Sequence, residues 1–446
     1  MQPPDSPPAT RSDWKDSLYE RLADDDEGRV CKGISEEACR QSPGNFLHTL
    51  AANTLTSIGD RLGSAKTTLP WLLGHLGAPA WIASLLVPVR ESGSMIPQIL
   101  IGAWVRRQPI RKGVWVLGSL IQGACLGGIA LTVLGAEGLA AGLWVLLLLM
   151  VFSLARGACS VAYKDVLGKT IPKTRRGRLS GWIASVSGLG AMGAGLVFGL
   201  FSDADSRLPL VLLPLGGGLL FLAASGFYSR IREEPGETDG GANGVAEALA
   251  KLALLREDPP FRRFVIARAL AMGSGLAAPF YITLARGDLG SAAAFLGVFI
   301  AVEGLAGMVS APLWGRWADR SSRLVFATAC GLAGLMSVTV AAWAWISPPA
   351  EAARWFYPSA FFVLGLAHAG IRLGRKTYLV DMAGGNKRTD YVAVSNTVIG
   401  GLLLLSGLAG ALASLFSVPG ALLLFGLAGL TGALLGLSWK EVSQKK

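Results

Sequence analysis

The chain has 446 residues, of which 52% are hydrophobic and only 16% are charged, whereas a soluble globular protein has about 25% charged residues. One water-soluble core cannot bury that much apolar surface, which excludes an ordinary soluble enzyme or binding domain. The formal net charge of +11 does not indicate nucleic-acid binding, because the basic residues lie mostly in short connections between apolar runs.

The apolar runs are continuous and close to the ~20 residues that a helix needs to cross a bilayer. A membrane β-barrel would instead show short segments of alternating polarity. The sequence therefore predicts an all-α polytopic membrane protein with about twelve transmembrane helices. They are expected at 47–73, 79–105, 113–135, 139–163, 179–201, 208–230, 263–285, 291–316, 323–346, 354–378, 391–414 and 418–439.

A polar stretch between the sixth and seventh runs divides the chain into two halves. It contains Glu233-Glu234-Pro235-Gly236 and Gly240-Gly241, which is typical of a flexible linker. Three of the five cysteines lie inside apolar runs, so no disulfide framework is expected. The predicted domains are an N-terminal tail at 1–45, a six-helix bundle at 46–230, a linker at 231–262, a second six-helix bundle at 263–440 and a short tail at 441–446.

The distribution of basic residues predicts the orientation of the chain. Connections on the side of the N-terminus are rich in Lys and Arg, whereas the opposite connections offer little beyond Arg207, Arg286 and Arg354. Basic loops remain in the cytoplasm, so both termini are expected there. Compact loops and a composition rich in Ala, Gly, Leu and Arg indicate the inner membrane of a bacterium.

Two parts of the chain resemble each other. Ala155-Arg156-Gly157 through Tyr163-Lys164 matches Ala367-His368-Ala369 through Arg375-Lys376, at a shift of about 212 residues, close to half the chain. Both segments leave the membrane into a basic loop. The simplest interpretation is two six-helix bundles related by a parallel repeat, with binding near the midplane between them.

The segment Gly315-Arg316-Trp317-Ala318-Asp319-Arg320-Ser321-Ser322-Arg323 resembles the loop signature Gly-x-x-x-Asp-Arg-x-x-Arg of the major facilitator superfamily. The resemblance implies a secondary active transporter, usually monomeric, in which two bundles rock around a central cavity and transport is coupled to protons or another ion. The first-half copy departs from the family pattern because Arg106 replaces the usual Asp. The fifth helix lacks the Pro of the antiporter motif, which weakens a multidrug–proton antiporter interpretation.

The same signature suggests a cytoplasmic gate. An Asp at the end of one helix can pair with Arg and with the positive N-terminus of a neighbouring helix, and such a pair would break when the cavity opens inward. The alternative is that these loop residues only fix topology. The candidate gate residues are Gly102, Arg106, Gly315, Asp319, Arg320 and Arg323.

Several ionisable residues fall inside the predicted helices: Asp60, Arg61, Lys66, Arg90, Glu91, Glu303 and His368 near the middle, and Arg156 and Arg372 toward the cytoplasmic ends. A lone charge at such depth costs about 2.5–3.5 kcal/mol, so these residues should face one another or a watered cavity. Adjacent helix residues point about 100° apart, which favours pairs between helices. Asp60 is expected to pair with Arg90. Arg61 is expected to pair with Glu91.

These residues divide into two candidate roles. Burial favours a neutral carboxyl and a nearby Arg favours a carboxylate, so movement of an Arg can load and release a proton. Asp60, Glu91 and Glu303 are therefore candidates for proton coupling. The cavity and substrate candidates are Arg61, Lys66, Arg90, Arg156, His368 and Arg372, whose charges would attract an anionic substrate. The alternative role for all of them is a set of fixed ion pairs that hold the helices together.

The chain shows no P-loop for ATP and no Cys/His cluster for a metal, so no enzyme activity, cofactor or metal is expected. The leading hypothesis is a proton-coupled transporter of a small molecule, with a slight preference for export. Its expected partners are the substrate, protons and membrane lipids. Two alternatives remain: a non-transporting membrane sensor or assembly factor, and a lipid or lysolipid transporter.

Overall fold

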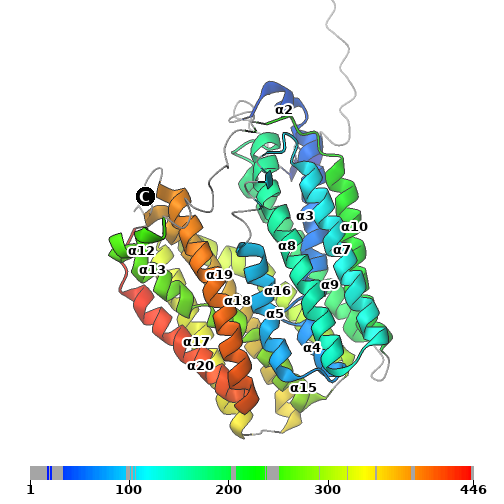
Figure 1. The fold of residues 1–446 in the computed structure, drawn as a ribbon, viewed down its shortest axis with the longest axis vertical. Helices are drawn as coiled ribbons and strands as arrows, with labels where there is room; N and C mark the ends of the chain where they lie inside the picture. The colour runs from blue at the N-terminus through cyan, green and yellow to red at the C-terminus, as the bar shows by residue number, and fades with distance from the viewer. Residues whose placement is uncertain are drawn as a thin grey trace, which may run out of the picture.

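The computed structural model describes residues 18–19, 21–22, 34–96, 101, 104–105, 107–201, 207–236, 238, 251–290, 292–318, 320–346, 349–382 and 387–442. All regular structure in these residues is helical. The helices form two groups that stand side by side, with the N-terminal half on the right and most of the C-terminal half on the left in Figure 1. We call the end at which α2 lies the upper end, and the end at which α4 and α15 lie the lower end.

The N-terminal half contains six membrane crossings. The short helix α2 (Glu36–Arg40) precedes them, and Cys39 on this helix is disulfide-bonded, contrary to the expectation of no disulfide. The crossings are α3 (Ser42–Leu62) with α4 (Thr68–His75), α5 (Ala80–Met95), α7 (Lys112–Gly135), α8 (Gly138–Thr170), α9 (Arg176–Phe201) and α10 (Leu208–Ser229).

The C-terminal half repeats this arrangement after η1 (Lys251–Ala253) and α12 (Leu254–Glu257). Its crossings are α13 (Pro259–Leu270) with α14 (Gly273–Leu276) and α15 (Ala278–Leu289), α16 (Ala293–Ala318), α17 (Ser322–Ile346), α18 (Ala350–Met382), α19 (Lys387–Phe416) and α20 (Val418–Leu437). Among the described residues, nine spans meet length and hydropathy requirements for crossing a membrane. With α3–α4, α5 and α19 the structure has the expected twelve crossings, which confirms the predicted fold class.

Two helices run further than the sequence predicts. Helices α8 and α18 both have 33 residues and extend beyond Lys164 and Tyr378 into polar sequence at the upper end. The apolar run ends at the membrane surface, but a helix satisfies its own backbone hydrogen bonds and can continue into water. Hydropathy therefore marks the bilayer boundary rather than the end of the helix.

The first crossing of each half is interrupted. Helix α3 ends at Leu62 and α4 starts at Thr68, whereas the seventh crossing is split into α13, α14 and α15. Gly63 follows α3, and Pro279 lies in the first turn of α15. Glycine destabilises a helix interior and proline cannot continue one. The sequence pairs Gly63-Ser64 and Gly273-Ser274 lie at these two breaks, which are therefore equivalent in the two halves.

The two halves pack closely against each other at two helix pairs, α5 with α19 and α9 with α16. At the first, Ser92 of α5 donates a hydrogen bond to the carbonyl of Gly400 on α19 (2.9 Å). At the second, α9 and α16 pack so closely that a Cβ atom added at Gly297 would lie 2.6 Å from the carbonyl oxygen of Gly195. Small residues allow this backbone approach in lipid, which accounts for part of the high glycine content.

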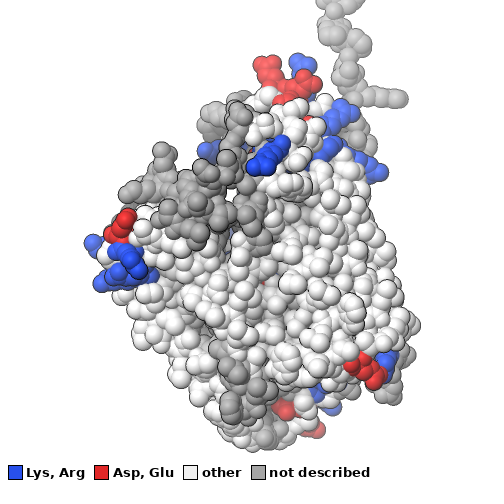
Figure 2. Space-filling model, viewed as in Figure 1, with Lys and Arg blue, Asp and Glu red and all other residues white. Residues whose placement is uncertain are grey.

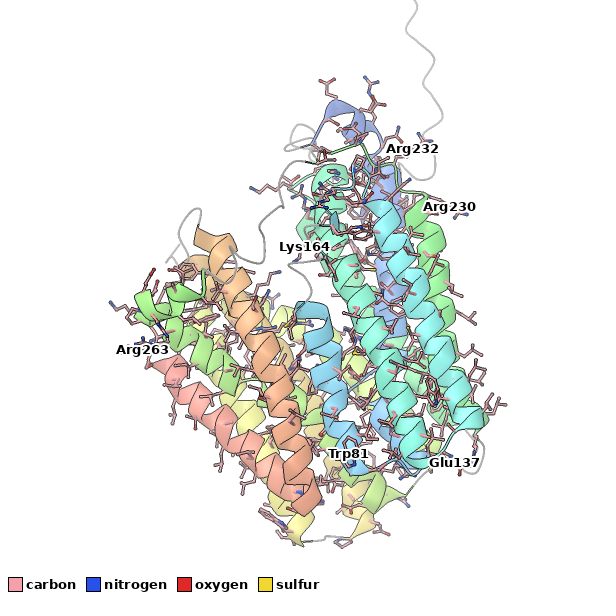
Figure 3. All side chains as sticks on the ribbon, viewed as in Figure 1. Trp81, Glu137, Lys164, Arg230, Arg232 and Arg263 are labelled. Atoms are coloured by element: carbon pink, nitrogen blue, oxygen red, sulfur yellow. The ribbon has the colours of Figure 1, made fainter. Side chains whose placement is uncertain are left out.

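Charge is distributed as expected for a protein that spans a membrane. On the face shown in Figure 2, the coloured Lys, Arg, Asp and Glu side chains gather toward the two ends and leave an uncharged band between them. Lys164 and Arg232 lie at the upper end, while Trp81 and Glu137 lie at the lower end (Figure 3). The uncharged band is the surface that can face lipid.

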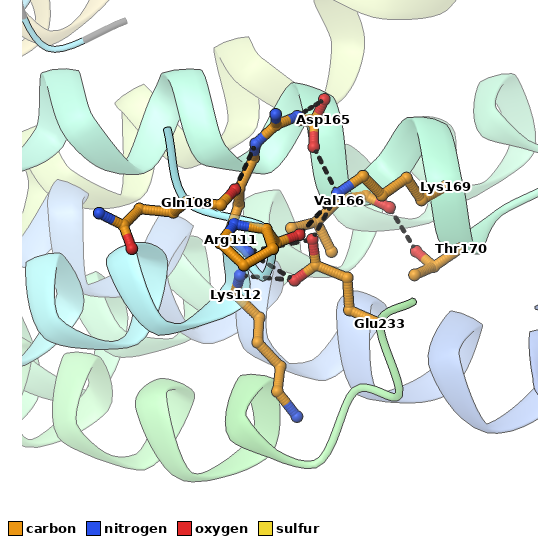
Figure 4. Close-up of polar contacts among 9 residues, drawn as sticks. Gln108, Arg111, Lys112, Asp165, Val166, Lys169, Thr170 and Glu233 are labelled. Atoms are coloured by element: carbon orange, nitrogen blue, oxygen red, sulfur yellow. Dashed lines mark hydrogen bonds and ion pairs between the residues drawn. The ribbon is translucent and has the colours of Figure 1, made fainter. Parts of the chain in front are cut away.

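A buried carboxylate organises the upper end of the N-terminal half (Figure 4). Glu233, whose side chain is 0% exposed, accepts hydrogen bonds from the backbone N–H groups of Arg111 (2.9 Å) and Lys112 (2.7 Å) at the start of α7. Lys169 contacts both Glu233 (3.0 Å) and Asp165 (3.1 Å). An anion at a helix N-terminus satisfies otherwise unpaired donors, so this cluster fixes α7, α8 and the segment after α10.

The close contact between α9 and α16 gives a test of this packing. We expect Gly297→Ala to destabilise the protein by about 1–3 kcal/mol, because the new methyl group would meet backbone atoms of α9 that cannot move independently. Gly193→Ala, on α9, is the control because a Cβ there meets nothing within 4 Å. Thermal unfolding in detergent micelles measures both, and equal stability of the two variants would contradict the close crossing.

Candidate functional site

A cavity of about 980 Å³ lies between the two halves. Its wall comes from α3, α5, α8 and α9 on one side and from α16 and α18 on the other. Tyr163 and Lys376, which line it, lie near the upper ends of α8 and α18, so the cavity extends toward that end.

The lower end is packed shut. Trp71 of α4 is fully buried, and its ring lies 6.3 Å from that of Phe299 on α16. A Cβ added at Gly74 of α4 would lie 3.1 Å from Arg286 of α15. In the described part of the chain, elements from both halves therefore close this end, whereas the cavity extends toward the upper end.

The first polar cluster in the cavity surrounds Asp60. Its Oδ1 atom lies 2.6 Å from Nη2 of Arg90, and its Oδ2 atom lies 3.6 Å from Nη2 of Arg156. The guanidinium of Arg90 also lies over the ring of Phe152, 4.9 Å from its centroid. The expected Asp60–Arg90 pair is confirmed, and it joins α3 to α5 and α8 within one half.

The expected pair between Arg61 and Glu91 is wrong. The Nη2 atom of Arg61 lies only 2.7 Å from the position that a Cβ of Gly307 would occupy, and Arg61 is close enough to Glu303 for direct electrostatic attraction. Glu91 instead lies in the electrostatic environment of Lys66 and Arg90. Because Arg61 follows Asp60, it points about 100° away, and this turn directs it toward α16 in the other half.

The first helix break contacts the other half at the cavity. Glu303 of α16 accepts a hydrogen bond from Thr67 (3.1 Å) and lies 3.5 Å from the hydroxyl of Ser64, both from the break after α3. This contact crosses from one half to the other. The sequence predicts Glu303 as a site residue but gives no role to Ser64 or Thr67.

A second contact between the halves involves His368 of α18. Its Nε2 atom lies 3.0 Å from Nζ of Lys66, and its Nδ1 atom lies 3.2 Å from the hydroxyl of Ser274. Lys66 comes from the first helix break and Ser274 from the second. Both breaks therefore place polar groups on one histidine, a juxtaposition that the paired Gly-Ser sequences at the breaks could have suggested.

The upper part of the cavity is basic. Arg372 and Lys376 line it, and Lys164 is near enough to Lys376 for electrostatic repulsion. Sequence reasoning missed two further cations, Arg268 and Arg375, which line a smaller chamber beside the cavity. The signal for Arg268 was present in the sequence, because it falls inside the predicted span 263–285.

The predicted gate residues are only partly described. Gly102, Arg106 and Asp319 lie outside the described residues, whereas Gly315 lines the cavity. Arg320 donates its backbone N–H to the carbonyl of Trp317 (3.0 Å). A gate role for these residues stays a prediction.

Arg323 contacts its own half. Its Nη1 atom donates to the carbonyls of Trp439 (2.9 Å) and Leu437 (3.2 Å), and its Nε atom lies 3.5 Å from Glu441. Lys112 does the same in the N-terminal half, where it donates to the carbonyl of Ile231 (2.7 Å). Cations at the C-terminal ends of helices are favourable, and these equivalent contacts extend the internal repeat to the loops.

The Asp60 cluster can be tested by its stability. We expect Arg90→Gln to cost about 1–2 kcal/mol, because one close partner of a half-buried carboxylate is lost. Arg156→Gln should cost less, since its contact is longer and its side chain is 36% exposed. Thermal unfolding of both variants, and of each combined with Asp60→Asn, measures the coupling. Strictly additive effects of Asp60→Asn and Arg90→Gln would contradict the pair.

Solved structures of transporters resemble the chain in fold. A D-xylose–proton symporter matches with a TM-score of 0.67 and 12% identity, covering 90% of this chain and 99% of that one. The inward-open xylose transporter XylE from E. coli matches with a TM-score of 0.65 and 12% identity, covering 90% and 97%. The nucleoside transporter NupG matches with a TM-score of 0.63 and 12% identity, covering 88% and 99%.

Sequence comparison adds the family. No protein with a curated function matches the sequence. The model of the Major Facilitator Superfamily matches residues 50–401 and again 269–446, so the two matches together cover most of the chain and overlap in its second half. The twelve crossings in two equivalent halves and the cavity between them agree with this match. The chain belongs to the major facilitator superfamily.

Proposed function

We propose that this protein is a proton-coupled secondary transporter of a small molecule, working by alternating access. The observation that supports the proposal most directly is the cavity of about 980 Å³, which extends toward the upper end and is closed at the lower end by contacts between the halves. A site that is accessible from one side at a time is the requirement for moving a solute against its gradient.

The contacts between the halves favour movement over a fixed assembly. Polar contacts at the cavity, Thr67 with Glu303 and Lys66 with His368, join the halves, and the apolar packing of α4 closes the lower end. The contacts of α5 with α19 and of α9 with α16 have glycine at the interface, and helices that meet through such small residues can shift along each other. Two rigid halves with such an interface can exchange which end is open.

Among the three carboxylates, Glu303 is the best candidate for the proton carrier. Protonation of Asp60 would break its contacts with two arginines. Protonation of Glu303 would alter a hydrogen bond between the halves and release its attraction to Arg61. A proton on Glu303 would therefore act directly on a contact that joins the two halves at the cavity. Glu91 is the alternative carrier, since it faces the same cavity.

The orientation follows from charge. The upper end carries the basic connections expected in the cytoplasm, so the cavity of this conformation would open inward, in the inner membrane of a bacterium. Charged side chains on the wall, among them Asp60, Arg90 and Arg372, favour a water-soluble substrate over a lipid. With an inward proton gradient, antiport would give export, which we retain as the preferred direction.

The coupling is tested by proton flux. In proteoliposomes with a trapped pH dye and pooled metabolites and drugs outside, we expect the wild-type protein to give substrate-dependent proton flux. Glu303→Gln should lose this flux but keep exchange of substrate for substrate, because the residue can no longer release a proton. Asp60→Asn and Glu91→Gln run alongside as the other candidate carriers.

The control for this measurement is Glu351→Gln, an exposed carboxylate at the start of α18 outside the cavity wall. It should give flux equal to that of the wild-type protein. Absence of flux with every pool, from folded protein reconstituted in both orientations, would overturn the proposal for those compounds. A non-transporting sensor or assembly factor would then be the better account.

The orientation is tested separately with fusions. Alkaline phosphatase, which is active only outside the cytoplasm, should be inactive when fused to the C-terminus. The same enzyme fused after Glu137, in the connection between α7 and α8 at the lower end, should be active, because alternate connections lie on opposite sides. The reverse pattern would place the open cavity on the outer side.

A further inference from the structure

A second chamber of about 120 Å³ adjoins the central cavity. Its own wall comes from α5, α13, α18 and α19, where Met95, Arg268, Arg375 and Leu403 line it. It shares part of its lining with the central cavity, and the shared residues are Lys66, Val87, Glu91, Ser274, His368 and Arg372. The chamber is therefore a side pocket of the proposed substrate site.

The charges that line this chamber do not balance. Among the described residues, four cations line it, Lys66, Arg268, Arg372 and Arg375, whereas Glu91 is the one carboxylate. In the described part of the chain, no carboxylate lies within 4.0 Å of the guanidinium groups of Arg268, Arg372 or Arg375. Positive charge left without a partner at this depth is costly, which indicates that an anion completes the site.

Arg268 is the most informative of these residues. It is only 5% exposed, and its Nη1 and Nη2 atoms donate to the hydroxyl of Ser395 (2.6 Å) and the side-chain oxygen of Asn396 (2.9 Å). Both partners are neutral, so they orient the guanidinium without compensating its charge. Its buried Nε atom has no hydrogen-bond partner. A buried, oriented and uncompensated guanidinium is suited to bind an oxyanion.

We propose that this chamber binds the anionic oxygen group of the substrate, a carboxylate or a phosphate, while the rest of the substrate occupies the central cavity. The inference rests on the proposed transport function and gives it a substrate class, the small organic anions. A water molecule takes a share of about 30 Å³ in the liquid, so a chamber of about 120 Å³ has room for one such group.

The position of the chamber favours a soluble anion over a lipid headgroup. Arg372 and His368 line both the chamber and the central cavity, so the site is reached from the cavity. Two other helices beside the chamber, α13 and α19, are joined by the hydrogen bond from Arg268 to Ser395. A lipid would have to pass its headgroup between these helices.

The test is binding of two simple probes, inorganic phosphate and acetate, to the purified full chain in nanodiscs of neutral phosphatidylcholine. Thermal stability is followed against probe concentration, with chloride at matched ionic strength as the reference. We expect phosphate, acetate or both to stabilise the wild-type protein beyond chloride. Arg268→Gln and Arg375→Gln should each weaken the apparent affinity by about tenfold or more, as for loss of a charge-assisted hydrogen bond.

The matched control is Arg354→Gln, which removes an exposed arginine from the opposite end of α18 and should leave the probe response unchanged. Arg268→Gln also loses the contacts with Ser395 and Asn396, so a purely structural role would lower stability equally with and without probe. Arg375→Gln removes a cation of the same chamber without touching those two contacts and decides the matter if Arg268→Gln does not fold.

Three outcomes would overturn the proposal. The first is no stabilisation beyond chloride by either probe, and the second is an equal probe response in the wild-type protein, Arg268→Gln and Arg375→Gln. The third is loss of the response when anionic phosphatidylglycerol replaces the neutral lipid, which would assign the chamber to a lipid headgroup. None of these measurements depends on proton flux, so the chamber and the proposed coupling can fail independently.

Discussion

The bilayer offers no solvent for a charged side chain or an open backbone group, and the architecture of this protein follows from that constraint. Charged residues inside the first, second, fourth, eighth and tenth crossings line the space between the halves. Asp60 is compensated by Arg90 and Arg156, and Glu303 by hydroxyl donors and nearby cations. The cavity is thus the place where these helices can carry polar groups. Without it, the same charged side chains would face lipid at a high free-energy cost.

The same constraint explains where helices are interrupted. A break exposes backbone N–H and C=O groups, which is tolerated at membrane depth only beside a cavity or inside protein. The breaks after α3 and after α13 both lie at the cavity, where they supply Lys66, Thr67 and Ser274. Elsewhere the halves meet through continuous helices with glycine at the contact, such as Gly297 against Gly195. Polar, irregular segments therefore contribute to the site, and continuous helices with glycine at the contact form the remaining packing between the halves.

How far the sequence predicts this arrangement depends on the range of the interaction. The crossings follow from hydropathy along single segments, and the internal repeat follows from matching segments in the two halves. Both agree with the structure apart from the extended ends of α8 and α18 and the breaks after α3 and α13. The Asp60–Arg90 pair could be predicted from the sequence because both residues lie at equal depth in consecutive crossings. The direction of Arg61 could not be predicted, because it depends on how α3 is rotated against α16. Arg375 falls inside the predicted span 354–378, but hydropathy does not show that it shares a chamber with Arg268 of α13, because that depends on how α13 and α18 pack.

Lys66 connects the two chemical features of the site. It lies in the lining of both the central cavity and the side chamber, contacts His368 in the opposite half and is within electrostatic reach of Glu303. An anion beside Arg268 and Arg375 would attract Lys66 toward the chamber and reduce the positive charge that Glu303 experiences. Loss of that charge favours a neutral carboxyl, so binding of the anion and uptake of the proton would promote each other, as linkage requires. Linkage of this sign would favour symport and would count against the preferred export by antiport. Under the proposed function, the residues that compensate buried charge in this fold would also couple a proton to a solute.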